Sequence, residues 1–265
     1  GTCIVSAENL GRLSADEISS LKDFVAPWFD ELIVVAYVRD PLQALKSKWE
    51  QDVKELREPL TGQELLAKTK HQMNYRFFER WIEAFGRDNF RLRRFEPSRF
   101  VGGNLLTDFL YTASITLQND LVIAERESNQ SLGEEGTALL LAMNARYPWY
   151  SDAGYNQDRG MVRRQHLFYK AMRESGAGPL RVNVLFDEAE AQNFNLKIDF
   201  LNSLLPKSDR FDEVAATTEL TKLPDSSAIS AEYVVELVNG LSHLVDDMAD
   251  RTDHLQNMKA KLPEN

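Results

Sequence analysis

Short apolar runs alternate with amphipathic stretches over the first 115 residues of the chain. Residues 2–6 and 32–38 are mainly apolar, and residues 90–95 alternate apolar and basic side chains; each segment is too short for a core helix. Their length and their β-branched and aromatic residues predict β-strands. Residues 32–38 are apolar at every position, which is typical of a strand buried on both faces of a parallel sheet.

The stretches between these runs carry helical patterns. Ser14 and Glu17 have the spacing of a capping box, in which each side chain bonds the other residue's backbone N–H, and they predict a helix to about residue 28. From Pro41 to about Leu56, apolar residues recur at spacings of three and four, which predicts a second helix. The stripe that we expect to face inward consists of Leu42, Leu45, Trp49 and Val53.

A third helical pattern runs from Glu64 to Phe85 and predicts one long helix, which ends at the turn that begins with Gly86. Strands and helices therefore follow one another in turn along this part of the chain. That order predicts βαβ units, and hence an α/β fold with a parallel sheet and right-handed crossovers.

Helical patterns dominate after about residue 131. They cover 132–145, 158–174, about 188–205 and 230 to about 261, while residues 180–186 are compatible with one more strand. We therefore predict an α/β core over residues 1–130 and a mainly helical part over residues 131–265, packed on the same domain.

The last predicted helix has two distinct faces. His243, Asp247, Asp250 and His254 share one face, and Val234, Val238, Leu241, Val245 and Met248 share the opposite one. Because an apolar stripe normally faces the core, we expect the His/Asp face to be solvated. We therefore do not expect a metal site there.

Composition and charge narrow the classes of partner. The chain of 265 residues has 41 acidic and 31 basic side chains, for a net charge of −10. This balance argues against broad binding of nucleic acid or of an anionic membrane surface, but it leaves room for a small anionic ligand held by a few arginines. One cysteine, Cys3, excludes a disulfide framework within the chain. No apolar run has the length of a membrane span and no signal peptide is recognisable, so we predict a cytoplasmic protein.

The clearest candidate site follows the apolar run 32–38. Asp40 is a natural helix N-cap and Pro41 a natural first helical residue, which places Arg39 at the carboxyl end of a strand. Ligands of open α/β sheets bind at that edge. Ser47 lies eight residues further on, away from the apolar stripe. The Arg39 guanidinium and the Ser47 hydroxyl are therefore a candidate phosphate-binding site. The alternative is an arginine paired with a surface carboxylate and a serine on a solvated helix face.

The densest group of basic residues is Arg91, Arg93, Arg94 and Arg99. Alternation along the strand places Arg91 and Arg93 on one face and Arg94 on the other. We expect at least two of these side chains to protect an edge strand by their charge rather than to bind a ligand.

The segment from Tyr37 to Pro41, continued to Ser47, resembles the sulfotransferases that use 3′-phosphoadenosine 5′-phosphosulfate (PAPS). Three further segments strengthen the resemblance to the bacterial polysaccharide-type branch of that family: Ile4–Leu10, Phe85–Asn89 followed by Arg93–Glu96, and Glu125–Leu132. The resemblance extends over residues 1 to about 135, and it rests on the order and spacing of the segments.

This resemblance implies a three-layer αβα fold of the P-loop type, with residues 1–130 as the nucleotide-binding core. It implies that Arg39 and Ser47 bind the 3′-phosphate of PAPS, and that Phe95 lies near the adenine, although a core phenylalanine is the simpler interpretation. Arg126 falls in a segment that resembles a cofactor-binding one, and its role stays open. The implied reaction moves a sulfuryl group to a hydroxyl or amine of a small-molecule or glycan acceptor, leaves adenosine 3′,5′-bisphosphate and needs no metal.

Two features of the resemblance concern the reactive end of the nucleotide. Sulfuryl transfer requires the acceptor to lose a proton, and Glu8, which follows the first predicted strand, is the candidate general base; a structural carboxylate bonded to loop backbone is an equal alternative. The family's Lys/Gly/Ser/Thr-rich phosphosulfate loop is not recognisable, since Gly133–Thr137 contains two carboxylates and has no preceding lysine. We expect that loop to precede Gly1.

Two other functions remain open at this stage. A P-loop-like kinase, or another nucleotide-dependent transferase, would share the fold, because a fold does not determine the chemistry. The chain is also compatible with a non-catalytic interaction module that lacks the phosphate loop.

Overall fold

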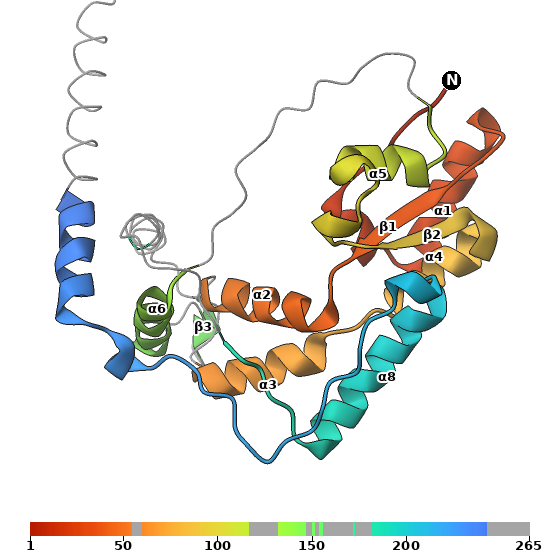
Figure 1. Cartoon of the computed structure of the whole chain (residues 1–265). Coiled ribbons are helices and arrows are strands. Elements are labelled where there is room, and N and C mark those ends of the chain that lie inside the picture. Colours follow the sequence, from red (N-terminus) through yellow and green to blue (C-terminus); the bar gives the residue numbers. More distant parts are fainter. Residues whose placement is uncertain are drawn as a thin grey trace, which may run out of the picture. The chain divides into compact units, whose positions relative to one another are not determined.

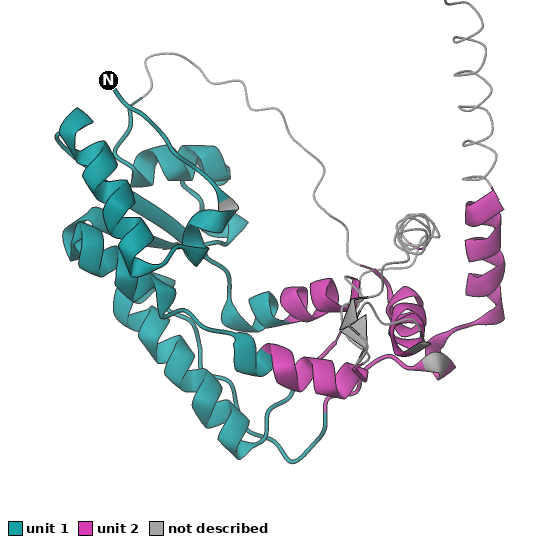
Figure 2. Cartoon of the chain, turned by 180° about the vertical axis from the view of Figure 1, so that it is seen from behind, with its two compact units in different colours: residues 1–45, 70–125, 185–220 teal, residues 46–69, 126–184, 221–265 magenta. Residues whose placement is uncertain are grey.

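A computed structural model describes residues 1–54, 60–116, 132–146, 150–151, 154–155, 172 and 182–242. The protein is mixed α/β, and its chain forms two compact units. Unit 1 comprises residues 1–45, 70–125 and 185–220, and unit 2 comprises residues 46–69, 126–184 and 221–265 (Figure 2). The boundary that we predicted near residue 130 stays a prediction, because residues 117–131 lie outside the described part.

Unit 1 is built on a parallel pair of strands, β1 (Val34–Val38) and β2 (Phe90–Arg94), shown in Figure 1. Val34 lies opposite Phe90 and Val38 opposite Arg94. The pairing confirms the two strands and their parallel direction. β1 is less buried than its composition predicts, because only Val38 is fully buried and the other four residues are partly exposed.

Helices lie on both faces of this sheet. Phe90 and Leu92 point to the face where α4 (Phe77–Phe85) packs, and the rings of Phe78 and Phe90 are 5.5 Å apart. Arg91 points to the opposite face and donates to the carbonyl of Thr112, the last residue of α5 (Leu105–Thr112). Period-two alternation along β2 therefore places α4 and α5 on opposite sides.

The other helices of unit 1 begin at well-formed caps. In α1 (Ala15–Val25), which packs against α4, the Ser14 and Glu17 side chains form the predicted capping box. α8 (Glu188–Leu204) begins with an equivalent box between Asp187 and Glu190. The short 3-10 helices are η1 (Glu8–Arg12), η2 (Ala26–Trp28), η3 (Arg87–Asn89), η4 (Pro97–Arg99), η5 (Val101–Gly103) and η6 (Lys207–Asp209).

Two predicted strands do not form. Residues 2–6 have no ladder hydrogen bonds, and Ile4 and Val5 are 52% and 65% exposed. Of residues 180–186, which are compatible with a strand, 182–186 are described and do not form one, although Val182 and Val184 are buried in alternation like strand residues. A β-favouring composition describes the fit of side chains to a sheet and does not by itself supply a partner strand.

The long helix predicted from Glu64 to Phe85 is two helices, α3 (Gly62–Gln72) and α4. Between them, the Asn74 side chain accepts a bond from the Arg76 backbone, and Met73 and Tyr75 are buried. Asparagine favours such local turns over helix interiors, and the burial of its two neighbours fixes the break.

Unit 2 contains the later part of α2 (Pro41–Lys54), most of α3, α6 (Glu134–Arg146) and a helix over residues 231–242. Trp49 and Val53 of α2 are 1% exposed, as the predicted stripe requires. The Asn144 amide of α6 donates to the carbonyl of Val53. The unit also holds the antiparallel pair β3 (Tyr150–Ser151) and β4 (Gly154–Tyr155), and η7 (Ser226–Ala228).

The helix over residues 231–242 packs differently from its predicted orientation. Tyr233 and Leu237 are buried, whereas Val234 and Val238 are 45% and 54% exposed. A Cβ on Gly136 of α6 would lie 3.0 Å from the Tyr233 hydroxyl, so this side of the helix lies against α6. The predicted stripe is therefore displaced by one position, and the His/Asp face, from His243 onward, lies outside the described residues. No helix in the described part of the chain is long and apolar enough to span a membrane.

Candidate anion site at the end of the parallel sheet

Arg39 follows β1 directly and is exposed, so its side chain stands at the carboxyl end of the sheet. Its guanidinium carbon lies 4.9 Å from the centre of the Phe95 ring, within the range of a cation–π contact. Within the described residues, no carboxylate forms an ion pair with this guanidinium. Its hydrogen-bonding fork is therefore open to an anion from solvent.

The carboxylate of the next residue, Asp40, caps the N-terminus of α2. Asp40 Oδ1 accepts from the backbone N–H groups of Leu42 and Gln43, both at 3.0 Å, and the Asp40 carbonyl accepts from Ala44 at 2.8 Å. These are the bonds of a helix N-cap, as the sequence predicts. Capping directs Asp40 Oδ1 to the helix backbone.

Phe95 is held in place by backbone and aromatic contacts. Its N–H donates to the Val38 carbonyl at 2.8 Å, which extends the parallel pairing by one bond. Its ring meets Phe100 edge-on at 5.4 Å and Tyr37 edge-on at 6.3 Å. Edge-to-face contacts at these distances are favourable. Arg39 therefore rests on an aromatic platform that the end of the sheet positions.

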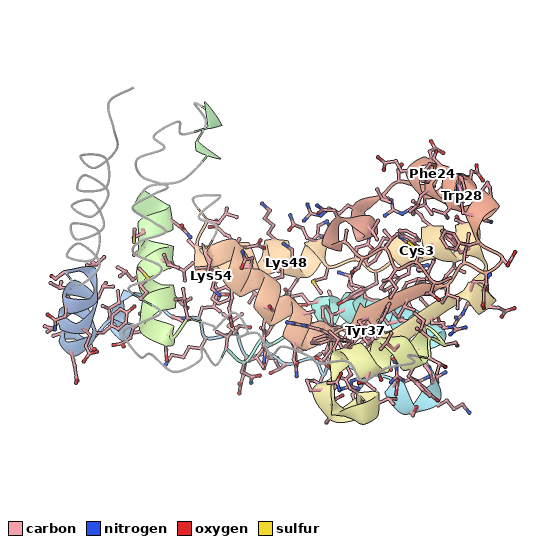
Figure 3. All side chains as sticks on the ribbon, turned by 90° about the horizontal axis from the view of Figure 1, so that it is seen from above. Cys3, Phe24, Trp28, Tyr37, Lys48 and Lys54 are labelled. Carbon is pink, nitrogen blue, oxygen red and sulfur yellow. The ribbon has the colours of Figure 1, made fainter. Side chains whose placement is uncertain are left out.

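The buried carboxylate of Asp108 holds Tyr37, whose ring contacts Phe95, in place. Asp108 of α5 is 0% exposed and accepts from the Tyr37 hydroxyl at 2.7 Å, from the Val101 N–H at 2.9 Å and from Arg93 Nη2 at 2.5 Å. Tyr37 of β1 and Arg93 of β2 are paired across the strands, and Figure 3 labels Tyr37 on β1. A single carboxylate thus joins both strands to α5.

These bonds determine how the groups titrate. Burial of Asp108 opposes its charged form, but the hydrogen bonds from Arg93, Tyr37 and Val101 outweigh burial and lower the pKa of the carboxyl. Burial, reinforced by the bond to Asp108, raises the pKa of Tyr37. Asp108 is therefore an ionised, fully bonded structural carboxylate and is not available as a proton acceptor for a substrate.

The basic cluster around β2 serves internal contacts. Arg91 bonds Thr112 and Ser114, and Arg93 bonds Asp108 and Asp209. Arg94 lies 2.8 Å from Glu96 and stacks on Phe211, while Arg99 bonds Glu96 and the Ser208 carbonyl. All four side chains are engaged with protein groups, three of them with the segment around residues 208–211. These bonds are internal contacts of the fold, whereas the sequence led us to expect that at least two of the side chains protect an edge strand by their charge.

The described structure does not test the remaining predicted site residues. Ser47 is exposed on α2, away from the buried stripe as expected, and belongs to unit 2, whereas Arg39 belongs to unit 1. Glu8 is the first residue of η1, but its side chain lies outside the described part. Arg126 also lies outside it. The roles predicted for these three residues stay predictions.

Sequence patterns did not indicate the supporting residues. Tyr37 is one more apolar position in its run, and Asp108 stands in an ordinary amphipathic stretch. The period of two along β1 does place Tyr37 on one face of the sheet. The carboxylate that meets this face comes from a helix about 70 residues further on, and no local pattern specifies it.

Among the residues that the structure describes, no cluster of three or more His, Cys, Asp or Glu side chains could hold a metal ion. No protein-family model matches the chain, and neither curated proteins nor solved structures provide a match. What the site does must therefore be argued from its own residues.

Proposed function

We propose that the protein is a PAPS-dependent sulfotransferase, in which Arg39 binds the 3′-phosphate of the nucleotide. The observation that carries the proposal is the exposed Arg39 guanidinium, stacked on Phe95 at 4.9 Å and without an ion pair among the described residues. The motifs around Arg39 resemble those of this family. The finer fold, a three-layer αβα arrangement of the P-loop type around a parallel sheet, belongs to the same proposal.

The chemistry of the site suits a nucleotide phosphate. A planar guanidinium offers two parallel N–H groups, which match two oxygens of a phosphate group. The adjoining N-terminus of α2 adds a positive potential. Phe95 presents an aromatic face that suits stacking against a base, although Arg39 already covers part of it. Together these groups favour an anionic ligand that also carries an aromatic ring.

The proposed reaction transfers a sulfuryl group. An acceptor oxygen attacks the sulfur of PAPS, the bond between sulfur and the phosphate oxygen breaks, and the acceptor proton leaves to a base. The products are a sulfate ester and adenosine 3′,5′-bisphosphate. The resemblance to the bacterial branch favours a glycan hydroxyl as the acceptor. In this scheme Glu8 takes the proton and Ser47 adds a hydrogen bond to the 3′-phosphate.

Calorimetric titration with adenosine 3′,5′-bisphosphate tests the proposal. Wild-type protein should bind the bisphosphate and should bind adenosine 5′-monophosphate at least tenfold more weakly, because the 3′-phosphate is then missing. Arg39→Ala should lower the affinity for the bisphosphate about tenfold to a hundredfold, as expected for a charge-assisted bond of about 1.5–3 kcal/mol. Its affinity for the monophosphate should change little.

Arg210→Ala is a matched control, because Arg210 is exposed and its side chain has no bond among the described residues. It removes the same charge and should leave the affinity unchanged. Equal affinity of wild-type and Arg39→Ala protein for the bisphosphate would refute the proposal that Arg39 binds the 3′-phosphate. A second experiment incubates the protein with an oligosaccharide and either PAPS or ATP as the donor, and identifies the product by mass spectrometry. A sulfotransferase adds a sulfuryl group from PAPS, whereas a kinase adds a phosphoryl group from ATP.

A further inference from the structure

The helix over residues 231–242 has a second apolar face, which stays exposed in the described structure. Tyr233 and Leu237 are buried on the side that lies against α6. Val234 and Val238 each follow one of these buried residues, and successive residues of a helix are about 100° apart, so the two valines lie on a different face. Their side chains are 45% and 54% exposed. An exposed apolar stripe of this kind suits a protein–protein contact.

The apolar positions of this face have the spacing of a coiled coil. Starting from residue 234, spacings of four and three alternate along the chain. The positions, which we call the seam, are Val234, Val238, Leu241, Val245, Met248, Thr252 and Leu255. A mean spacing of 3.5 residues keeps one stripe directed at a partner helix along its whole length. The seam residues from 245 onward lie outside the described part, so the sequence alone provides the pattern there.

The residue types of the seam favour a second copy of the same helix as the partner. With residue 234 at a heptad d position, the a positions hold residues branched at Cβ, namely Val238, Val245 and Thr252. The next d positions hold unbranched Cβ atoms, in Leu241, Met248 and Leu255. β-Branched residues at a with leucine at d favour parallel dimers over larger bundles. In such a dimer every seam residue meets its counterpart from the other copy.

The polar positions of this segment argue against a membrane surface as the partner. The heptad b, c and f positions, which a coiled coil directs to solvent, include Asp246, Asp247, Asp250 and Asp253. A helix that lies on an anionic membrane carries lysine and arginine on its polar face instead. Aspartates at outward positions do not oppose the pairing of two copies, because they lie far from the seam.

We propose that two copies of the protein associate through the seam, as a parallel two-stranded coiled coil of the helix that begins at residue 231. Val234, Val238 and Leu241 of one copy contact the same residues of the other. Tyr233 and Leu237 keep their place against α6 of their own chain, so the two apolar faces of the helix have different partners. The inference does not depend on the proposed function, because Arg39 takes no part in it.

Sedimentation equilibrium of the full chain tests the association. The wild-type mass should rise with protein concentration from 30.3 kDa toward twice that value. Val238→Asp places one carboxylate from each copy in the seam, and should raise the dissociation constant about a hundredfold. Val235→Asp makes the same change at a side chain that is 59% exposed and stands at a heptad e position, where charges are tolerated. It should change the dissociation constant by less than about threefold.

A disulfide cross-link tests the parallel register. Cys3 is the single cysteine of the chain, so Cys3→Ser gives a background without thiols. In that background Leu241→Cys brings two thiols together at a d position, and oxidation with copper–phenanthroline should produce a covalent dimer. Asn239→Cys, at an outward b position, should produce little. Both cysteine variants should retain the circular dichroism spectrum of the wild type, which excludes unfolding as the cause of a difference.

Three results would overturn the inference. A wild type that stays at 30.3 kDa at every concentration means that another segment of the chain, a different protein or a lipid covers the stripe. A dimer that Val238→Asp does not weaken forms through another surface. A cross-link that forms through Asn239→Cys in preference to Leu241→Cys contradicts the parallel register and the assignment of the seam.

Discussion

Arg39 stacks on Phe95 at the carboxyl end of two parallel strands, with 4.9 Å between the guanidinium carbon and the centre of the ring. One residue follows β1 and the other follows β2, and the Phe95 N–H bonds the Val38 carbonyl directly before Arg39. The strand pairing therefore determines where the cation stands. The affinity of this site for an anion therefore depends on the strand pairing as well as on the arginine.

Replacing the ring should weaken anion binding without removing the charge. Phe95→Leu retains an apolar side chain but loses the cation–π contact, worth about 0.5–1 kcal/mol at an exposed site. We expect the affinity for adenosine 3′,5′-bisphosphate to fall about two- to fivefold in calorimetric titrations. Phe211→Leu, which removes the ring 4.6 Å from the Arg94 guanidinium, is the control and should leave the affinity unchanged.

Neutralising the buried carboxylate should destabilise unit 1. Asp108→Asn leaves Arg93 without its closest ion-pair partner. It also puts an amide in place of the carboxylate that accepts from the Tyr37 hydroxyl and the Val101 N–H. Breaking a buried pair costs about 3–5 kcal/mol, although the remaining bond of Arg93 to Asp209 should reduce this loss. Urea unfolding of the variant should show the decrease, and Asp30→Asn, at an exposed position, should not.

The same carboxylate predicts a loss of stability in acid. Because the pKa of Asp108 is lowered in the folded protein, its contribution is complete above the ordinary aspartate pKa of about 3.9 and is lost as the pH falls through the lower folded value. Urea midpoints of the wild type should therefore decrease on acidification below pH 4. The difference between the wild type and Asp108→Asn should shrink over the same range, and a constant difference would contradict this assignment.

Two adjacent glycines allow backbone strain to be separated from steric clash. Gly102 and Gly103 both have positive φ, at 69° and 74°. A Cβ at Gly102 would lie 2.7 Å from Thr107 Cγ2, whereas a Cβ at Gly103 would meet nothing within 4 Å. Gly103→Ala should cost about 1–2 kcal/mol from the left-handed conformation, and Gly102→Ala should cost more. Thermal unfolding of both variants checks the order, which equal losses would contradict.

An exposed pair of aromatic residues stands apart from the site. Phe24 and Trp28 are 73% and 75% exposed at the end of α1 and in η2, where Figure 3 labels them. Nothing in the described structure shows what covers them. They belong to neither the core nor the anion site.

Local rules predicted the ends of elements well. Ser14 and Glu17 form their capping box, Asp40 caps α2, and both strands that pair begin or end within two residues of their predicted limits. Each of these features depends on atoms a few residues apart along the chain. Short-range hydrogen bonding and the period of the apolar pattern therefore suffice to predict them.

Features that need a distant partner were not predictable in this way. Residues 2–6 have a strand composition but no paired neighbour, and the helix over 231–242 turns Tyr233 and Leu237 inward instead of Val234 and Val238. In both cases the sequence contains several apolar side chains that could be buried. Which of them are buried depends on the neighbouring surface against which the segment packs. Periodicity alone cannot supply that surface.

The sequence by itself determined that Arg39 stands at the end of a strand before a capped helix, because the apolar run, Asp40 and Pro41 are adjacent in the chain. Only the tertiary structure decided that Arg39 rests on Phe95, and that Tyr37 and Arg93 converge on Asp108. The physical reason is distance along the chain. These contacts join residues about 15 to 70 positions apart, and it is the parallel pairing of β1 with β2 and the packing of α5 that bring them together.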